Sequence, residues 1–173
     1  MATKVAINGF GRIGRLVARA ILERSDHDLE LVSINDLADT KSNALLFQYD
    51  STHGRFPGTV EVADGAMVVN GKTIAVTSER DPGSLPHAAQ GVDIVLECTG
   101  FFQSHEAAEP HLTAGAKRVL ISAPAKNVSA TIVYGVNHDV LTAEDVIVSN
   151  ASCTTNCLSP VAKVLHDIVG IER

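Results

Sequence analysis

A glycine-rich turn between an apolar run and an amphipathic segment constrains the fold of this chain most. Lys4 to Asn8 is a short apolar run, and three glycines spaced G-x-G-x-x-G follow it. Beyond the turn, apolar residues recur at the spacing of one helix face: Ile13, Leu16, Val17, Ala20 and Ile21. Leu29 to Ile34 is a second apolar run. We therefore expect a strand, a helix and a second strand joined as a parallel crossover.

A different β pattern follows the predicted crossover. Three pieces rich in β-branched residues, Val60 to Ala63, Ala66 to Val69 and Thr73 to Thr77, are separated by Asp64-Gly65 and Asn70-Gly71. Both dipeptides favour the two-residue turns of β-hairpins. This stretch is predicted to form a small antiparallel insertion.

The parallel pattern then resumes. One helical segment, Ser104 to Ala114, lies among four apolar or β-branched runs: Val92 to Cys98, Val119 to Ser122, Thr131 to Val136 and Val146 to Ser149. Strands that are apolar on both faces are typical of parallel sheets covered by helices on each side. The predicted fold is therefore a Rossmann-type, doubly wound α/β fold, with a mostly parallel sheet and a small antiparallel insertion.

The last segment has the pattern of an amphipathic helix that begins near Cys153. Its apolar side carries Leu158, Val161, Ala162, Leu165, Ile168 and Val169. Pro160 lies inside the pattern, so we expect it to kink the helix or to mark its effective start. No further strand or capping signal follows. We expect residues 1–152 to form a nucleotide-binding domain and residues 153–173 to begin a second domain whose remainder is absent.

The glycine turn also predicts a ligand. In this spacing Gly9 allows the tight turn, Gly11 lets a pyrophosphate approach the backbone, and Gly14 lets the helix pack closely on the sheet. The free N–H groups around Arg12 and Ile13 would point at the anion. Asp36 closes the second strand, where a carboxylate accepts from ribose hydroxyls and repels a 2′-phosphate, so NAD is favoured over NADP. The alternative is a turn whose glycines serve packing only, with Asp36 a solvated strand end.

Cys153 is a candidate nucleophile because it lies between a buried strand and a helix. Backbone N–H groups at such a junction stabilise a thiolate and an oxyanion. The alternative is an inert thiol, as we expect for Cys98 inside its apolar run. Cys157 is one helical turn beyond Cys153, but the pair lacks the further ligands that zinc requires, so no metal is expected. The seven histidines, His166 included, are interpreted as surface or packing residues.

The charge balance narrows the range of partners. The formal net charge is -6, which argues against nucleic acid or an anionic membrane as the main partner. Neither a signal segment nor an apolar run of membrane-spanning length is recognisable. Three cysteines cannot all pair within one chain. We expect a cytoplasmic protein with reduced thiols.

Three segments together resemble phosphorylating glyceraldehyde-3-phosphate dehydrogenase. They are Asn8 to Gly14, the strand end Asn35-Asp36, and residues 149–156, which read Ser-Asn-Ala-Ser-Cys-Thr-Thr-Asn. The last is highly specific to that family and its nearest relatives. Shorter stretches are similar too, namely 49–54, 97–100 and 121–124. The resemblance covers the whole chain and corresponds to roughly the first half of the family's subunit.

The resemblance implies roles for individual residues. Cys153 would be the nucleophile, and Ser152 and Thr154 would help to hold the substrate and phosphate. The contacts of NAD would be Gly9, Gly11, Arg12, Ile13 and Gly14 at the pyrophosphate, Asp36 at the ribose, and Arg80, Thr99, Phe102 and Ser122 along the adenine and nicotinamide sides. In such enzymes the thiolate adds to the aldehyde, hydride passes to the nicotinamide, and inorganic phosphate attacks the thioester to give 1,3-bisphosphoglycerate in glycolysis.

The family's catalytic base is a histidine beyond Arg173, and the family forms homotetramers. The resemblance therefore implies an NAD-binding fragment of a catalytic subunit, without turnover of its own. Two alternatives remain open. The chain is a stand-alone NAD-binding module without catalysis, or it belongs to the erythrose-4-phosphate dehydrogenase relative, which is similar over this half.

Overall fold

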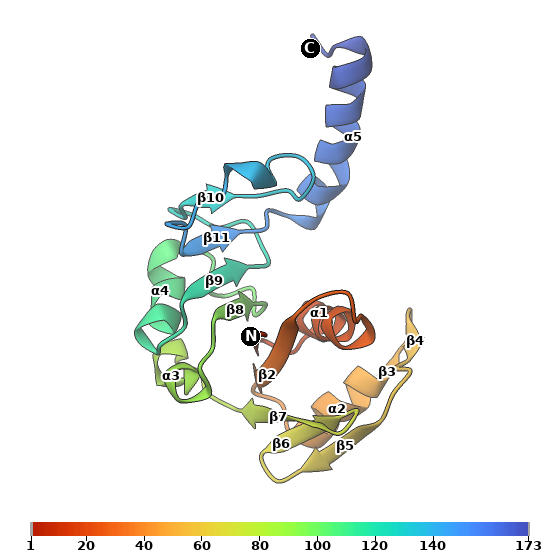
Figure 1. Cartoon of the computed structure of the whole chain (residues 1–173), viewed down its shortest axis with the longest axis vertical. Helices are drawn as coiled ribbons and strands as arrows, with labels where there is room; N and C mark the ends of the chain where they lie inside the picture. Colours follow the sequence, from red (N-terminus) through yellow and green to blue (C-terminus); the bar gives the residue numbers. More distant parts are fainter. Residues whose placement is uncertain (1, 173) are drawn as a thin grey trace.

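The structure is a computed structural model that describes residues 2–172. Within these residues nine strands form one sheet in the order β10-β11-β9-β8-β1-β2-β7-β6-β5 (Figure 1). The strands are β1 (Thr3–Asn8), β2 (Leu29–Asn35), β5 (Val60–Ala63), β6 (Ala66–Val69), β7 (Lys72–Thr77), β8 (Ile94–Glu97), β9 (Arg118–Ile121), β10 (Ala130–Thr131) and β11 (Ile147–Ser149). All neighbours from β10 to β7 are parallel, which confirms the predicted fold class.

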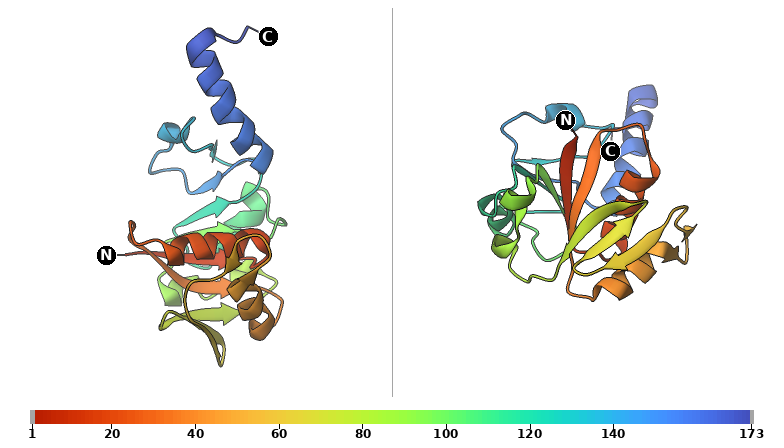
Figure 2. Two further views of the ribbon diagram at one scale, coloured as in Figure 1. Left: turned by 90° about the vertical axis from the view of Figure 1, so that its right-hand side faces the viewer. Right: turned by 60° about the horizontal axis from the view of Figure 1, so that its bottom comes forward.

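Helices cover both faces of the sheet. The helices are α1 (Arg12–Glu23), α2 (Thr40–Gln48), α3 (His87–Gln90), α4 (His105–Thr113) and α5 (Cys153–Val169), with 3-10 turns at Pro82–Ser84 and His138–Val140. Val5 and Ile7 of β1 pack in the cluster that includes residues of α1 and α2, whereas Ala6 packs in the cluster that includes α4. Successive side chains of a strand point to opposite faces, so β1 is buried on both. Figure 2 shows the sheet from two further sides.

The antiparallel hairpins form as predicted, but they extend the main sheet. Strands β5, β6 and β7 pair antiparallel through turns at Asp64-Gly65 and Asn70-Gly71. The last of them, β7, also pairs parallel with β2. A separate two-stranded ribbon is formed by β3 (Tyr49–Asp50) and β4 (Gly54–Arg55). The hairpins therefore continue the sheet at one edge.

The structure differs from the prediction in one strand and one helix. The strand expected over Thr131 to Val136 ends at Thr131, because Gly135 adopts a φ of 81° and the side chain of Asn137 accepts from the N–H of Val133. Helix α2 has no counterpart among the predicted elements. It begins where the side chain of Asp39 accepts from the N–H of Ser42, and its weak apolar pattern gave no periodic signal.

Helix α5 begins at Cys153 and runs through Pro160 to Val169, so the prediction that Pro160 marks its effective start is wrong. The side chain of Ser152 accepts from the N–H of Thr155 and starts the helix upstream of the proline. The helix projects away from the sheet (Figure 1), and none of its residues is buried against the part of the chain that the structure describes.

Arg19 joins helix α1 to the end of α2 and to β4. Its side chain is 5% exposed, and the guanidinium donates to the carbonyls of Phe47, Gln48 and Gly54 at 2.7–3.2 Å. It also lies 5.8 Å from the ring centroids of Phe47 and Phe56. Carbonyl oxygens and aromatic faces thus surround this buried cation.

We predict that Arg19→Met lowers the free energy of unfolding by about 2–4 kcal/mol, because three carbonyls lose a charged donor. Urea unfolding followed by circular dichroism measures the change. Arg24→Met is the matched control, since water screens the exposed Arg24–Asp26 pair and its loss is expected to change the stability little. Equal stability of Arg19→Met and the unaltered chain would contradict the assigned role.

Candidate cofactor-binding site

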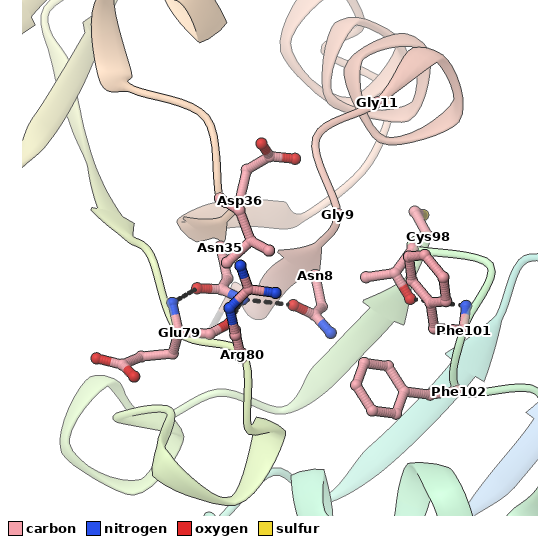
Figure 3. Close-up of a pocket in the computed structure, with 12 residues that line it drawn as sticks. Asn8, Gly9, Gly11, Asn35, Asp36, Glu79, Arg80, Cys98, Phe101 and Phe102 are labelled. Atoms are coloured by element: carbon pink, nitrogen blue, oxygen red, sulfur yellow. Dashed lines mark hydrogen bonds between the residues drawn. The ribbon is translucent and has the colours of Figure 1, made fainter.

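A cavity of about 470 Å³ lies at the carboxyl ends of β1, β2 and β8 (Figure 3). The strand order reverses beside β1, since β2 follows it on one side and β8 on the other. Ligands of doubly wound sheets bind at this position. The cavity is lined by Asn8, Gly9, Gly11, Asn35, Asp36, Leu37, Glu79, Arg80, Cys98, Thr99, Phe101 and Phe102.

The three glycines have three different surroundings. A Cβ on Gly14 would lie 2.1 Å from the carbonyl oxygen of Gly9, so this glycine permits the close approach of α1 to the end of β1. Gly9 has a φ of 90°, and a Cβ there would lie 2.7 Å from the backbone nitrogen of Thr99. A Cβ on Gly11 would meet no protein atom within 4 Å, and Gly11 lines the cavity. Its open side leaves room for a ligand.

Helix α1 presents its N-terminus to this open side. Gly11 is the N-cap and has no side chain to accept from the first turn, so the early N–H groups, including those of Arg12 and Ile13, are available to an anion. The guanidinium of Arg12 pairs instead with Asp50 at 3.0 Å. The N–H groups of His53 and Thr52 hold the pKa of the Asp50 carboxyl well below its usual range, and Arg12 adds to the effect.

Asp36 is fixed by the glycine turn. One carboxylate oxygen accepts from the N–H of Phe10 at 2.7 Å, and the other accepts from the N–H of Ala38 at 2.9 Å. Figure 3 shows Asp36 and Arg80 on one side of the cavity and Phe101 and Phe102 on the other. A planar ring bound between the two sides would meet aromatic faces on one side and polar groups on the other.

Most of the predicted cofactor residues line the cavity, and the others lie around it. Gly9, Gly11, Asp36, Arg80, Thr99 and Phe102 are lining residues. Ser122 is not a lining residue, and its N–H donates to the carbonyl of Glu97. Among the described residues, the lining does not include Ser152, Cys153 or Thr154, which lie at the start of α5. The structure thus brings together the residues assigned to the cofactor and leaves those assigned to the substrate outside the cavity.

Several lining residues were not predicted from the sequence. Asn8 and Asn35 are buried at the ends of β1 and β2, and the amide of Asn35 donates to the amide oxygen of Asn8 at 2.7 Å. Asn35 also accepts from the N–H of Glu79. Polar residues at the carboxyl ends of adjacent parallel strands are a signal that would have found both asparagines. Leu37, Cys98 and Phe101 carry no comparable signal.

Cys153 is an exposed residue in the first turn of α5. The residue two before it, Ala151, has a φ of 57°, which turns the chain sharply between β11 and the helix. The amide of Asn156 donates to the carbonyls of Asn150 and Ser152 at 2.7 and 3.0 Å, and closes this turn. The thiol is therefore accessible at a helix N-terminus, as predicted.

Cys98 differs from Cys153 in its surroundings. Burial raises the pKa of the Cys98 thiol to about 11, a hydrogen bond with Ser122 works against this rise, and the nearby Glu97 adds to it. Such a thiol is protonated and unreactive at neutral pH. Among residues 2–172, no group of three or more His, Cys, Asp and Glu side chains is arranged so that it could hold a metal ion. No helix in this part of the chain is both long and apolar enough to span a bilayer.

Residues 3–105 match the protein family described as "Glyceraldehyde 3-phosphate dehydrogenase, NAD binding domain". The chain belongs to this family. It is 66% identical over 174 residues to glyceraldehyde-3-phosphate dehydrogenase of Zymomonas mobilis, covering 100% of this chain and 52% of the relative. The enzyme of Xanthobacter flavus is 61% identical, covering 100% of this chain and 52% of the relative. The enzyme of Clostridium pasteurianum is 59% identical, covering 99% of this chain and 51% of the relative. The chain thus spans about half the length of these relatives.

NAD is the cofactor of the family's domain, and the cavity fits it. Gly11 leaves the pyrophosphate position open, the N-terminus of α1 supplies N–H groups there, and Asp36 stands where a ribose hydroxyl would donate. Phe101 and Phe102 offer aromatic surface. The cavity therefore offers N–H donors, a carboxylate acceptor and aromatic surface, which are the groups that a dinucleotide requires.

We predict that alanine at Gly14 lowers stability, whereas alanine at Gly11 lowers the affinity for NAD. Gly14→Ala lowers the free energy of unfolding by about 2–4 kcal/mol, because its Cβ overlaps the carbonyl of Gly9 and the helix must move. Gly11→Ala changes stability by less than about 1 kcal/mol, but weakens NAD binding by occupying the open side of the turn. Thermal unfolding and titration calorimetry separate the two effects. Unchanged NAD affinity in Gly11→Ala would contradict the proposed pyrophosphate position.

Proposed function

We propose that this chain is the NAD-binding part of a phosphorylating glyceraldehyde-3-phosphate dehydrogenase. The reaction is the NAD-dependent oxidation of glyceraldehyde 3-phosphate with inorganic phosphate to 1,3-bisphosphoglycerate, a step of glycolysis. One observation carries the proposal: Cys153 lies exposed in the first turn of α5, and the chain that carries it is 59–66% identical, over 171–174 residues, to three relatives named for this enzyme.

In this proposal Cys153 is the nucleophile. Backbone N–H groups at the start of α5 stabilise negative charge on its sulfur and on the oxygen of the attacked aldehyde. The hydroxyls of Ser152 and Thr154, which lie 2.9 Å apart, hold substrate and phosphate beside it. NAD, when bound, accepts the hydride. Gly9, Gly11, Arg12, Ile13 and Gly14 bind its pyrophosphate through backbone groups.

The remaining cofactor contacts are proposed on the walls of the cavity. Asp36 accepts from a ribose hydroxyl, and Arg80, Thr99, Phe102 and Ser122 border the adenine and nicotinamide sides. Of these, all but Ser122 line the cavity, and Ser122 is hydrogen-bonded to the lining residue Cys98. The position of four of these residues around one cavity supports their common role.

We further propose that residues 1–152 form the NAD-binding domain and residues 153–173 begin the catalytic domain. Strand β11 is the last strand along the described chain, and the helix α5 that follows it exposes its apolar face, including Leu158, Ile168 and Val169. We propose that the whole enzyme is a homotetramer and that it is located in the cytoplasm. The tetramer is proposed from the family, and the cytoplasm from the three cysteines, which cannot all pair within one chain.

We predict that the chain binds NAD more tightly than NADP, and that Asp36→Asn narrows the difference. Like charges at the ribose position cost about 1–3 kcal/mol in a partly dry groove, which is about 5- to 150-fold in affinity. Titration calorimetry measures both dissociation constants. Glu79→Gln is the control, because this lining carboxylate points away from Asp36 (Figure 3) and is not expected to change the ratio. Equal affinities in the unaltered chain would show that Asp36 is wrongly assigned.

We also predict that iodoacetamide alkylates Cys153 about two to five times faster than Cys157. The free N–H groups of the first turn of α5 stabilise charge on Cys153, whereas Cys157 lies one turn further along. Cys98 reacts slowest, since its thiol has a pKa of about 11. Peptide mass mapping after limited labelling gives the three rates. Preferential labelling of Cys98 or Cys157 would overturn Cys153 as the nucleophile.

A further inference from the structure

A buried carboxylate lies directly behind the cavity without lining it. Glu97, the last residue of β8, is 1% exposed. One of its oxygens accepts from the N–H of Thr99 at 2.7 Å and from the hydroxyl of the same residue. The other accepts from the amide of Asn8 at 2.6 Å and faces the Nε2 of His111 at 3.1 Å. Donors therefore surround both oxygens of Glu97.

These bonds reach both walls of the cavity. On one side, the hydroxyl of Thr99 also accepts from the N–H of Phe101 at 3.0 Å, which shapes the loop after β8. On the other side, the amide oxygen of Asn8 accepts from Asn35, which in turn accepts from the N–H of Glu79 at 2.8 Å. Asn8, Thr99, Phe101, Asn35 and Glu79 all line the cavity. A single carboxylate thus connects the two walls through hydrogen bonds.

His111 of α4 holds this carboxylate from the opposite face of the sheet. It is 0% exposed, and its Nδ1 lies 3.1 Å from the Nε2 of His87. Burial and, to a smaller extent, the neighbouring His111 together lower the pKa of His87 to about 4, so His87 is neutral at pH 7. A neutral His87 that donates to His111 leaves the Nε2–H of His111 to donate to Glu97. The ring of Phe102, another lining residue, meets that of His111 edge to face at 6.3 Å.

We propose that Glu97, held by His111, is a positioning residue for NAD. It does not touch the cofactor. It sets the positions of Thr99 and Asn8, and through them the loop of Phe101 and the segment of Glu79, before NAD binds. The proposal rests on the NAD binding of the proposed function. It adds that the affinity for NAD depends on the hydrogen bonds of Glu97, a residue that does not line the cavity.

The substitution Glu97→Gln tests this pattern with little change of shape. The oxygen of the new amide still accepts from Thr99, but its NH₂ group then faces the NH₂ group of Asn8, and two donors oppose each other. We expect the dissociation constant of NAD to rise about tenfold or more at a temperature where the variant is fully folded. Met67→Ala is the stability control, because Met67 is a buried residue of β6 and is expected to lower the unfolding temperature without changing the NAD affinity.

The double variant Asn8→Asp with Glu97→Gln provides a rescue. In this double variant the carboxylate lies at position 8 and accepts from the new amide at position 97. The net charge of the double variant equals that of the unaltered chain, because Asn8→Asp restores the negative charge that Glu97→Gln removes. We expect the double variant to regain most of the lost NAD affinity. A non-additive gain of this kind measures the coupling between the two positions. No gain over Glu97→Gln would overturn the proposal.

Thr99→Val supplies a second route if Glu97→Gln does not fold. It removes only the hydroxyl between Glu97 and Phe101, and we expect weaker NAD binding and faster amide exchange at Phe101. If Glu97→Gln folds and its NAD affinity is unaltered, the positioning role is refuted and the proposed function stays intact. If Glu97→Gln does not fold, unaltered NAD affinity in Thr99→Val has the same consequence. Absence of NAD binding in the unaltered chain would overturn both.

Discussion

The close approach of helix α1 to the end of β1 is the contact on which the site depends. With a hydrogen in place of a side chain at Gly14, the carbonyl of Gly9 lies where a Cβ would be, and the helix packs directly on the strand. This contact aims the N-terminus of α1 at the cavity. It also brings the N–H of Phe10 to Asp36, which is thereby held at the cavity rim. The pyrophosphate and ribose positions thus follow from one backbone contact.

The polar groups under the cavity are satisfied by one another. Asn8, Asn35, Glu97 and His111 are buried at the ends of strands or on the facing helix, and each has hydrogen-bond partners within the network. Buried polar groups without partners would cost about 1–3 kcal/mol each, so the mutual bonds of these four side chains favour one arrangement of the walls. Arg19 acts in the same way on the other side of α1, where carbonyls and aromatic rings hold it.

Features set by neighbouring residues were predictable from the sequence, whereas those set by distant contacts were not. The glycine turn, the two hairpin turns and the fold class each follow from a local pattern, and the structure confirms them. The strand over Thr131 to Val136 was predicted too long because the bond from Asn137 competes with the sheet. Asn8 and His111 are 103 residues apart in the sequence, so no local pattern could reveal that they share Glu97.

The start of α5 and the rest of that helix are held by different interactions. The turn before Cys153 is tied to the sheet, since the hydroxyl of Ser149 donates to the carbonyl of Ala123 and accepts from the N–H of Ala151. Further along, α5 buries no residue in the part of the chain that the structure describes, and local bonds such as Lys163–Asp167 support it. Isolated helices of about this length are marginal in water. The placement of the Cys153 backbone therefore depends on the end of β11 and on the Ser152 cap, and only weakly on the helix beyond its first turn.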